Sequence, residues 1–316
     1  RDYRQHDEAA PLKYQDPVKG RDGTRRSTLR RYAEVVRVHL IPGLGRVRLD
    51  KLTPRDVQRF LDGLRPRLAS ASVVKVHGVL RVALSDAERL DLVPRNVAKA
   101  AKPTTVARSE RRALTPEEAK RFLSVVAGDR LGSAFVVALA TGLRRGELLG
   151  LRWCDVDLEG RVLFVRQTLQ RVGGRLAVAE PKTHRSARPV PLSGLAVRAL
   201  EEQRDRQEKD RVAAGELWQE TGLVFTSTVG TALEPRNLNR RFQELRRRAG
   251  LDWLRLHDLR HAFATFLLDQ GEDLRTVMEL LGHSTIRLTA DTYGHVLPRR
   301  ARVAAETIDR LLSGAS

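Results

Sequence analysis

The chain has 316 residues, one cysteine and a formal net charge of +19. This length exceeds what one ordinary hydrophobic core uses and predicts two domains. No apolar run approaches the roughly 18 residues of a membrane span, and the lone Cys154 excludes a disulfide framework and a cysteine-based zinc site. The start of the chain is polar and charged and has no secretory signal, so we expect a cytoplasmic protein.

The positive charge predicts a nucleic-acid partner. Residues 1–105 hold 23 Lys and Arg against 12 Asp and Glu, a net charge of +11, and the other 211 residues carry the remaining +8. The excess is therefore denser in the N-terminal third. On charge alone, a merely basic soluble protein is the alternative.

The first third of the chain has the pattern of a small helical domain. Residues 1–26 are polar and contain Pro and Gly, which is typical of an arm or linker. Leu29, Tyr32, Val35 and Val36 recur at helical spacing within residues 27–38. The Pro- and Gly-containing residues 39–49 predict a turn.

Two further helices complete this domain. Thr53 can cap a helix whose first turn contains Pro54 and Asp56. Residues 70–90 form a longer helix with inward-facing Val73, Val76, Leu80 and Leu84. Residues 98–109 read as an exposed basic linker. The predicted organisation is an arm or linker (1–26), a helical DNA-binding bundle (27–105) and a second domain (110–316).

The second domain begins near Leu114 with a capping box, Thr115 to Glu118. Its first helix has Phe122, Val125 and Val126 on the inner face. Residues 132–140 predict a buried helix that ends at Thr141-Gly142, and a new helix starts at residues 144–149.

Strand signals follow in residues 161–168, 175–179 and 188–192, with a turn at Gly173-Gly174. They predict a three-stranded antiparallel sheet whose third strand, with Pro189 and Pro191, lies at an edge. From Ser193 onward the pattern is helical. The predicted fold class is mainly α with a small antiparallel β-sheet.

Four separated stretches hold the residues suited to chemistry. They are residues 141–151 (TGLRRGELLGL), 181–192 (PKTHRSARPVPL), 257–265 (HDLRHAFAT) and 281–296 (LGHSTIRLTADTYGHV). In this order they resemble the T-G-x-R-x-x-E box, the lysine-bearing hairpin turn, the H-x-x-R box and the L-G-H…Tyr box of the tyrosine recombinase (phage integrase) family.

The resemblance spans residues 27–310, since residues 32–64 look like the core-binding domain of integrases. It implies an N-terminal SAM-like helical bundle, followed by an α+β catalytic domain.

The chemistry of DNA strand exchange explains why these residue types occur together. Transesterification of a phosphodiester adds charge to its non-bridging oxygens, and Arg144 and Arg260 can each grip a phosphate through two donors. His257 lies one helical turn before Arg260, so both can point at one phosphate. The resemblance assigns proton exchange to His257, a phosphate hydrogen bond to His283, and the acidic supporting position to Glu147. We expect Glu147 to orient Arg144 or a histidine.

The nucleophile is expected to be Tyr293, because of the four tyrosines it alone lies shortly after a histidine motif. A tyrosine is mostly neutral at pH 7 and needs activation. Lys182, in the turn between two strands, can protonate the leaving 5′ oxygen. We expect no cofactor and no metal ion, because no P-loop and no metal-ligand motif is present.

The resemblance implies a site-specific recombinase that cuts and rejoins double-stranded DNA through a 3′-phosphotyrosyl intermediate, to integrate and excise a mobile element. It also implies a homotetramer on paired DNA sites and a Holliday junction, with DNA-bending or directionality proteins as accessory partners. We expect no membrane partner. Residues 301–312 have helical spacing and either dock on a neighbouring protomer or cap their own domain.

Three alternatives remain open. A chromosome-dimer resolvase of the Xer type would use the same chemistry. A type IB topoisomerase would use similar residues, but the integrase-like first domain argues against it. A non-catalytic DNA-binding descendant is disfavoured because all six expected catalytic side chains are present. The absence of an initial Met and the charged arm favour a further arm-binding domain before residue 1.

Overall fold

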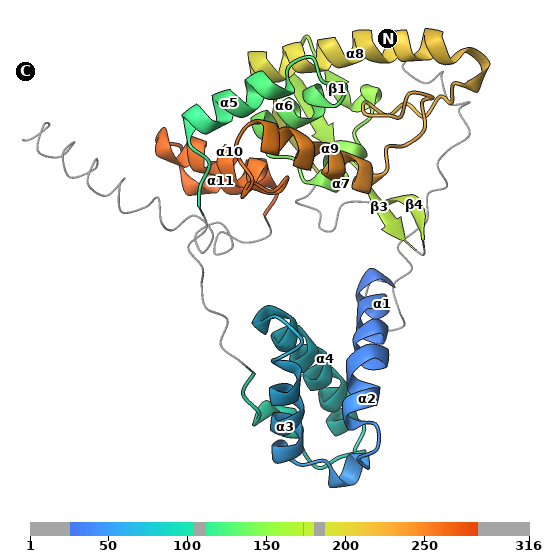
Figure 1. Cartoon of the computed structure of the whole chain (residues 1–316), viewed down its shortest axis with the longest axis vertical. Coiled ribbons are helices and arrows are strands. Elements are labelled where there is room, and N and C mark those ends of the chain that lie inside the picture. Colours follow the sequence, from blue (N-terminus) through green and yellow to red (C-terminus); the bar gives the residue numbers. More distant parts are fainter. Residues whose placement is uncertain (1–25, 104–111, 173, 180–186, 284–316) are drawn as a thin grey trace, which may run out of the picture. The chain divides into compact units, whose positions relative to one another are not determined.

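The structure is a computed structural model, and it describes residues 26–103, 112–172, 174–179 and 187–283 (Figure 1). These residues divide into two compact units, 26–103 and 112–283. Each unit has a hydrophobic core of its own. The predicted fold class, mainly α with a small antiparallel sheet, is confirmed.

The smaller unit contains four α-helices within its described residues. They are α1 (Arg26–Val35), α2 (Ile41–Leu44), α3 (Pro54–Leu64) and α4 (Ser70–Arg89), with a π-helical turn (Val36–Leu40) and two 3₁₀ turns (Leu49–Lys51 and Val97–Lys99). The predicted N-cap at Thr53 is confirmed, and the structure extends it to a capping box, since Thr53 and Asp56 each accept a hydrogen bond from the other's backbone N–H. The four predicted inward residues of α4 are all buried.

The predicted turn at residues 39–49 is wrong in its first half, because the helix continues to Leu44. Pro42 lies in the first turn of α2, where a proline costs little. The π-helical turn before it lets Ile41 N–H donate to the carbonyl of Val36, one residue further back than in an α-helix. Leu29, one of the four apolar residues at helical spacing, is 38% exposed.

The larger unit carries helices on both sides of its strands. Its helices are α5 (Pro116–Val126), α6 (Gly132–Thr141), α7 (Arg145–Leu149), α8 (Gly194–Ala214), α9 (Pro235–Arg248), α10 (Asp258–Asp269) and α11 (Leu274–Leu281). Its strands are β1 (Val156–Asp157), β2 (Val162–Val165), β3 (Thr168–Val172), β4 (Arg175–Ala179) and β5 (Arg188–Pro191).

The strands form two sheets instead of the single predicted one. The three-stranded sheet has the order β1-β2-β5, so the proline-containing β5 lies at an edge as expected. Residues 161–168 were read as one strand, but pairing breaks after Val165, and β3 begins at Thr168. β3 then pairs with β4 alone, in a register that matches Val172 with Arg175 across the predicted glycine turn. Figure 1 shows this ribbon projecting from its unit.

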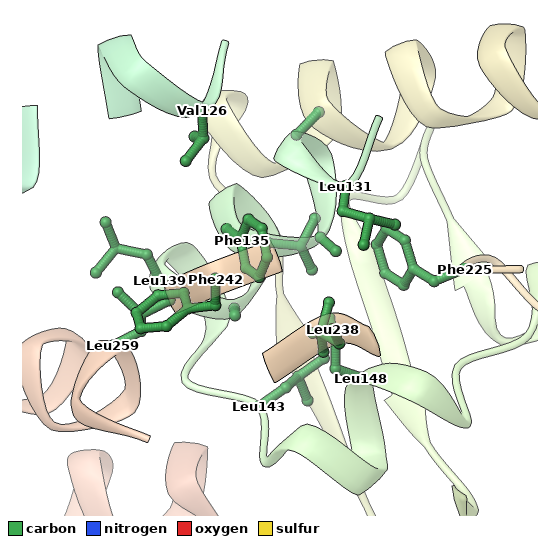
Figure 2. Close-up of a cluster of buried hydrophobic side chains, with 14 of the residues drawn as sticks. Val126, Leu131, Phe135, Leu139, Leu143, Leu148, Phe225, Leu238, Phe242 and Leu259 are labelled. Carbon is green, nitrogen blue, oxygen red and sulfur yellow. The ribbon is translucent and has the colours of Figure 1, made fainter. Parts of the chain in front are cut away.

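The core of the larger unit joins α5, α6 and α9 through aromatic side chains. Phe242 of α9 lies 5.4 Å from Phe122 and 5.5 Å from Phe135, measured between ring centroids. Figure 2 shows Phe135 and Phe242 among leucines from α6, α7 and α10. Each buried aromatic ring contributes on the order of 2 kcal/mol. This packing holds the beginning of α7 and α10 in place, and both carry candidate site residues.

Candidate active site

Two glycines end helices at the centre of the candidate site. Gly142 ends α6 and Gly282 ends α11, and both adopt left-handed backbone with φ of 63° and 62°. A side chain at Gly142 would also collide with Phe263, whose ring carbon lies 2.6 Å from the position of a Cβ. The T-G and L-G pairs of the two sequence motifs are therefore helix stops that leave carbonyl groups pointing out of helix ends.

The two candidate arginines bind those carbonyl groups in a crossed arrangement. Arg260 Nη1 donates to the carbonyl of Gly142 at 2.7 Å, and its Nη2 donates to that of Leu281 at 2.6 Å. Arg144 Nη2 donates to the carbonyl of Gly282 at 3.1 Å. Since Leu281 and Gly282 are consecutive, the two guanidinium groups lie side by side at the C-terminal end of α11, where the helix dipole favours cations.

Glu147 of α7 is nearly fully buried and contacts Arg144. Arg144 Nη1 donates to its Oε1 at 2.7 Å, and the backbone N–H of Arg144 donates to its Oε2 at 3.0 Å. Arg188 of β5 donates to the same carboxylate, with Nη2 3.2 Å from Oε2. Burial raises the pKa of Glu147, but Arg188 and Arg144 outweigh it and hold the pKa below its usual value. Glu147 is therefore an anion that accepts hydrogen bonds from both the side chain and the backbone of Arg144.

His283 follows Gly282 and is buried against the arginine group. Burial lowers its pKa from 6.5 to about 4, and the charges of Arg260, Arg144 and Arg188 act in the same direction. The imidazole is consequently neutral near pH 7 and can donate one N–H hydrogen bond. Arg144, Glu147, Arg260 and His283 thus come together from α7, α10 and the end of α11.

His257 occupies a more open position, as the residue before α10. It is exposed, and its ring meets that of His261 edge to face at 4.8 Å between centroids. It also lines a pocket of about 410 Å³ between α6, α7 and α9. The pocket is lined by apolar residues and by the polar or basic residues Arg145, Arg246, Arg255, Asn239 and Gln243. Among the described residues that line it there is no acid, so the surface next to His257 suits an anionic ligand.

Two candidate residues, Lys182 and Tyr293, lie outside the described residues. One site residue was missed by the sequence reasoning. Arg188 was read only as part of an edge strand, although it is buried and bound to Glu147. The signal was its place in the alternation of the strand. Residues 188 and 190 of β5 are buried and both prolines are exposed, so a basic side chain occupies a position where an apolar one is usual.

Among the described residues, no group of three or more His, Cys, Asp or Glu side chains is placed to hold a metal ion. Within the same ranges, no helix is both long and apolar enough to cross a membrane.

Two family models match the chain. The phage integrase family matches residues 112–300, and the phage integrase N-terminal SAM-like domain matches residues 20–65.

Three curated proteins illustrate the sequence similarity. A tyrosine recombinase XerC-like protein of Caldanaerobacter subterraneus is 38% identical over 62% of this chain, but the match covers only 53% of that protein. An integrase of Streptomyces ambofaciens is 32% identical over 87% of this chain and 72% of its own length. The ICEBs1 integrase of Bacillus subtilis is 30% identical over 84% of this chain and 72% of its own length.

Solved structures share the fold. The Tn1549 transposon integrase in complex with circular-intermediate DNA superposes with a TM-score of 0.78, at 22% identity, over 91% of this chain and 95% of that chain. A lambda integrase tetramer bound to a Holliday junction superposes with a TM-score of 0.60, at 21% identity, over 84% of this chain and 74% of that one.

Proposed function

Because the chain belongs to the phage integrase family of tyrosine recombinases, we propose that it cuts and rejoins double-stranded DNA at specific sites to integrate and excise a mobile element. The main observation behind this proposal is the pair of arginines bound to backbone carbonyls at the end of α11. Arg144 and Arg260 are held side by side by backbone carbonyls, next to a neutral histidine. Such a cationic cluster matches one phosphate group.

The proposed cleavage step replaces one phosphate ester by another. The phenol oxygen of Tyr293 bonds to the scissile phosphorus, the bond from phosphorus to the 5′ oxygen breaks, and a 3′-phosphotyrosyl link forms. The phenol proton passes to His257, and Lys182 gives a proton to the leaving 5′ oxygen. A 5′ hydroxyl from another strand then attacks the phosphotyrosine by the reverse route, so the reaction consumes no high-energy cofactor.

The arginines stabilise the charge that develops on the non-bridging oxygens. Arg144 is about one third exposed, and two of the five N–H donors on its guanidinium serve the contacts to Glu147 and Gly282. His283, being neutral, contributes a hydrogen bond rather than a charge. Because Glu147 and the backbone carbonyls fix these side chains, little reorganisation is needed when they bind a phosphate.

DNA binding and assembly extend this proposal. The pocket beside His257 and its basic lining suit the sugar-phosphate backbone next to the scissile phosphate. A homotetramer on two paired sites, passing through a Holliday junction, follows from the need to exchange four strands. The lambda integrase structure is a precedent for such an assembly. DNA-bending or directionality proteins are proposed accessory partners.

Covalent capture tests this function. Nicked suicide duplexes lose the short cut strand and so trap the enzyme on the DNA. The chain is incubated with a library of such duplexes made from genomic fragments, and the trapped DNA is sequenced. We expect adducts concentrated at a small set of related sites. Absence of any covalent adduct, with duplex binding intact, would refute the enzymatic proposal.

A chromosome-dimer resolvase is the second candidate, because the relative with 38% identity is named XerC-like. The recovered sites separate the two functions. Pairs of sites at the ends of a mobile element and in its target support an integrase, whereas one site near the replication terminus supports a resolvase.

A further inference from the structure

We infer that Arg188 is a positioning residue of the strand-transfer site, acting through Glu147 and the end of α11. This inference rests on the proposed function, and it adds a residue outside the six expected catalytic side chains and Glu147. Arg188 is the first residue of β5, and its side chain is 6% exposed. A guanidinium buried so deeply must satisfy its donors inside the protein.

Its contacts join β5 to α7, which carries Glu147, and to α11, which ends just before His283. Nη2 donates to Glu147 Oε2 at 3.2 Å and Nη1 lies 3.4 Å from Oε1, which ties β5 to α7. Nε donates to the carbonyl of Leu280 at 2.6 Å, which ties β5 to α11. Leu280, Leu281 and Gly282 thereby give three consecutive carbonyls to three arginines. Arg188 is thus bound both to Glu147, which holds Arg144, and to the same end of α11 that binds Arg260 and Arg144.

The role follows from what Glu147 does. Its carboxylate accepts from both the side chain and the backbone of Arg144, so it determines where the Arg144 guanidinium points. Without Arg188, the buried carboxylate would keep a single arginine partner and its pKa would rise, since burial favours the neutral acid. A protonated Glu147 accepts more weakly, so Arg144 would lose its orientation.

Several charged or titratable groups near Glu147 affect the pH dependence of the site. Arg144 precedes α7 and Arg188 lies on β5, and both form salt bridges with the carboxylate. Arg260 and His261 on α10, together with His283 after α11, form the adjoining group, because Arg260, Arg144, Arg188 and His261 all influence the pKa of His283. Burial is the largest cause of the low pKa of His283, and Arg188 contributes less to it than Arg260 or Arg144. His283 therefore stays mostly neutral when Arg188 is lost, in the pH range where Glu147 would take up a proton.

The test compares Arg188→Gln with wild type in single-turnover cleavage of a nicked suicide duplex between pH 5 and 9. We expect duplex affinity within about twofold, because Arg188 is buried, and cleavage slower by about tenfold or more, because one partner of a buried pair is lost. The distinctive result is the pH profile: its acidic limb should move to higher pH by about one unit. Arg188→Lys should recover only part of the rate, since an ammonium group cannot span both partners.

A double variant makes the inference independent of protein stability. If Arg188 acts through Glu147, then Glu147→Gln with Arg188→Gln should be no slower than Glu147→Gln alone, and the shifted limb should disappear. Arg152→Gln is the matched control, because Arg152 pairs with the buried Asp155 at 2.7 Å elsewhere in the same unit. It should lower the melting temperature without moving the pH profile.

The outcomes separate clearly. An Arg188→Gln rate reduced by one factor at every pH, multiplying with the Glu147→Gln effect, would show an ordinary structural arginine and overturn the inference. A wild-type chain that never cleaves would instead refute the proposed function itself, whatever the variants do. If Arg188→Gln does not fold, Arg188→Lys and the double variant still decide the case through the same pH profile.

Discussion

Arg144 and Arg260 show how backbone carbonyls can fix the position of two cationic side chains. Both arginines donate hydrogen bonds to carbonyl groups at helix ends. The left-handed backbone of Gly142 and Gly282 ends the two helices and leaves these carbonyls available. Fixed cations of this kind act on developing charge without reorganisation, which is why they contribute more to the transition state than to the ground state.

Arg144→Ala and Arg260→Ala should therefore each reduce single-turnover cleavage by about 100-fold, corresponding to about 3 kcal/mol of transition-state stabilisation. Duplex affinity should change far less, because many other basic residues neutralise the backbone. Cleavage rates on a suicide duplex, paired with binding isotherms and circular dichroism, measure both effects. Near-wild-type cleavage by either folded variant would remove that arginine from the site.

His283 gives a prediction for the stability of the protein alone. Its pKa is about 4 when folded, against 6.5 for an ordinary histidine, so the unfolded chain takes up a proton at a higher pH. The free energy of unfolding should consequently fall as pH drops from about 6.5 to about 4, by about 3 kcal/mol at most from this group. His283→Asn should flatten that dependence in thermal melts across the window. Parallel curves for the two proteins would mean that His283 is not held neutral.

At the scale of elements, the sequence predicted most helices because their start signals are local. The capping boxes at Thr53 and Thr115 each complete themselves within four residues. The sheet was harder, since the apolar pattern of residues 161–168 is continuous and predicts one strand. The break after Val165 depends on which partner each half finds, β5 or β4, and that partner lies outside the local pattern.

The candidate site was also predictable from the sequence only where the signals are local. The motifs identified Arg144, Glu147, Arg260 and His283, and the structure brings all four together. They could not reveal Arg188, because its partners lie 41 and 92 residues away along the chain. Nor could they reveal that His283 is neutral, since its pKa depends on burial and on three arginines from three elements.

Helix α9 supplies a test of the DNA-facing surface. Arg240 and Arg247 are exposed two turns apart on the helix that lines the pocket beside His257. Replacing both with Ala should weaken duplex binding and reduce the slope of log affinity against log salt by about two, since each phosphate contact contributes about 0.9. Cleavage at saturating protein should change little. Arg204→Ala on α8, a helix of mixed charge, is the control. If it weakened duplex binding equally, α9 would have no particular role in DNA binding and the prediction would be wrong.

For the molecule as a whole, two separate cores and an uneven charge suggest two separable DNA-binding parts. The smaller unit buries its own cluster around Val57, Leu61 and Val73, and residues 1–105 carry a net charge of +11. We proposed the boundaries 27–105 and 110–316 from sequence, and a truncation tests them directly.

A fragment from residue 110 onward should fold, keep weak cleavage and bind duplex with lower affinity than the full chain. Its salt slope should also be flatter, by nearly three if three phosphate contacts are lost. Binding of both proteins to one core-site duplex across a salt series measures this. Equal slopes and equal affinities would show that the first unit does not grip DNA.

The central claim is that Tyr293 becomes covalently joined to DNA. The most direct measurement is to trap wild-type protein on a nicked suicide duplex, digest it with protease and nuclease, and locate the nucleotide by mass spectrometry. The account predicts a 3′-phosphate attached to the peptide containing Tyr293, and no adduct in a Tyr293→Phe variant that still binds duplex. An adduct on another residue, or one that persists in Tyr293→Phe, would contradict it.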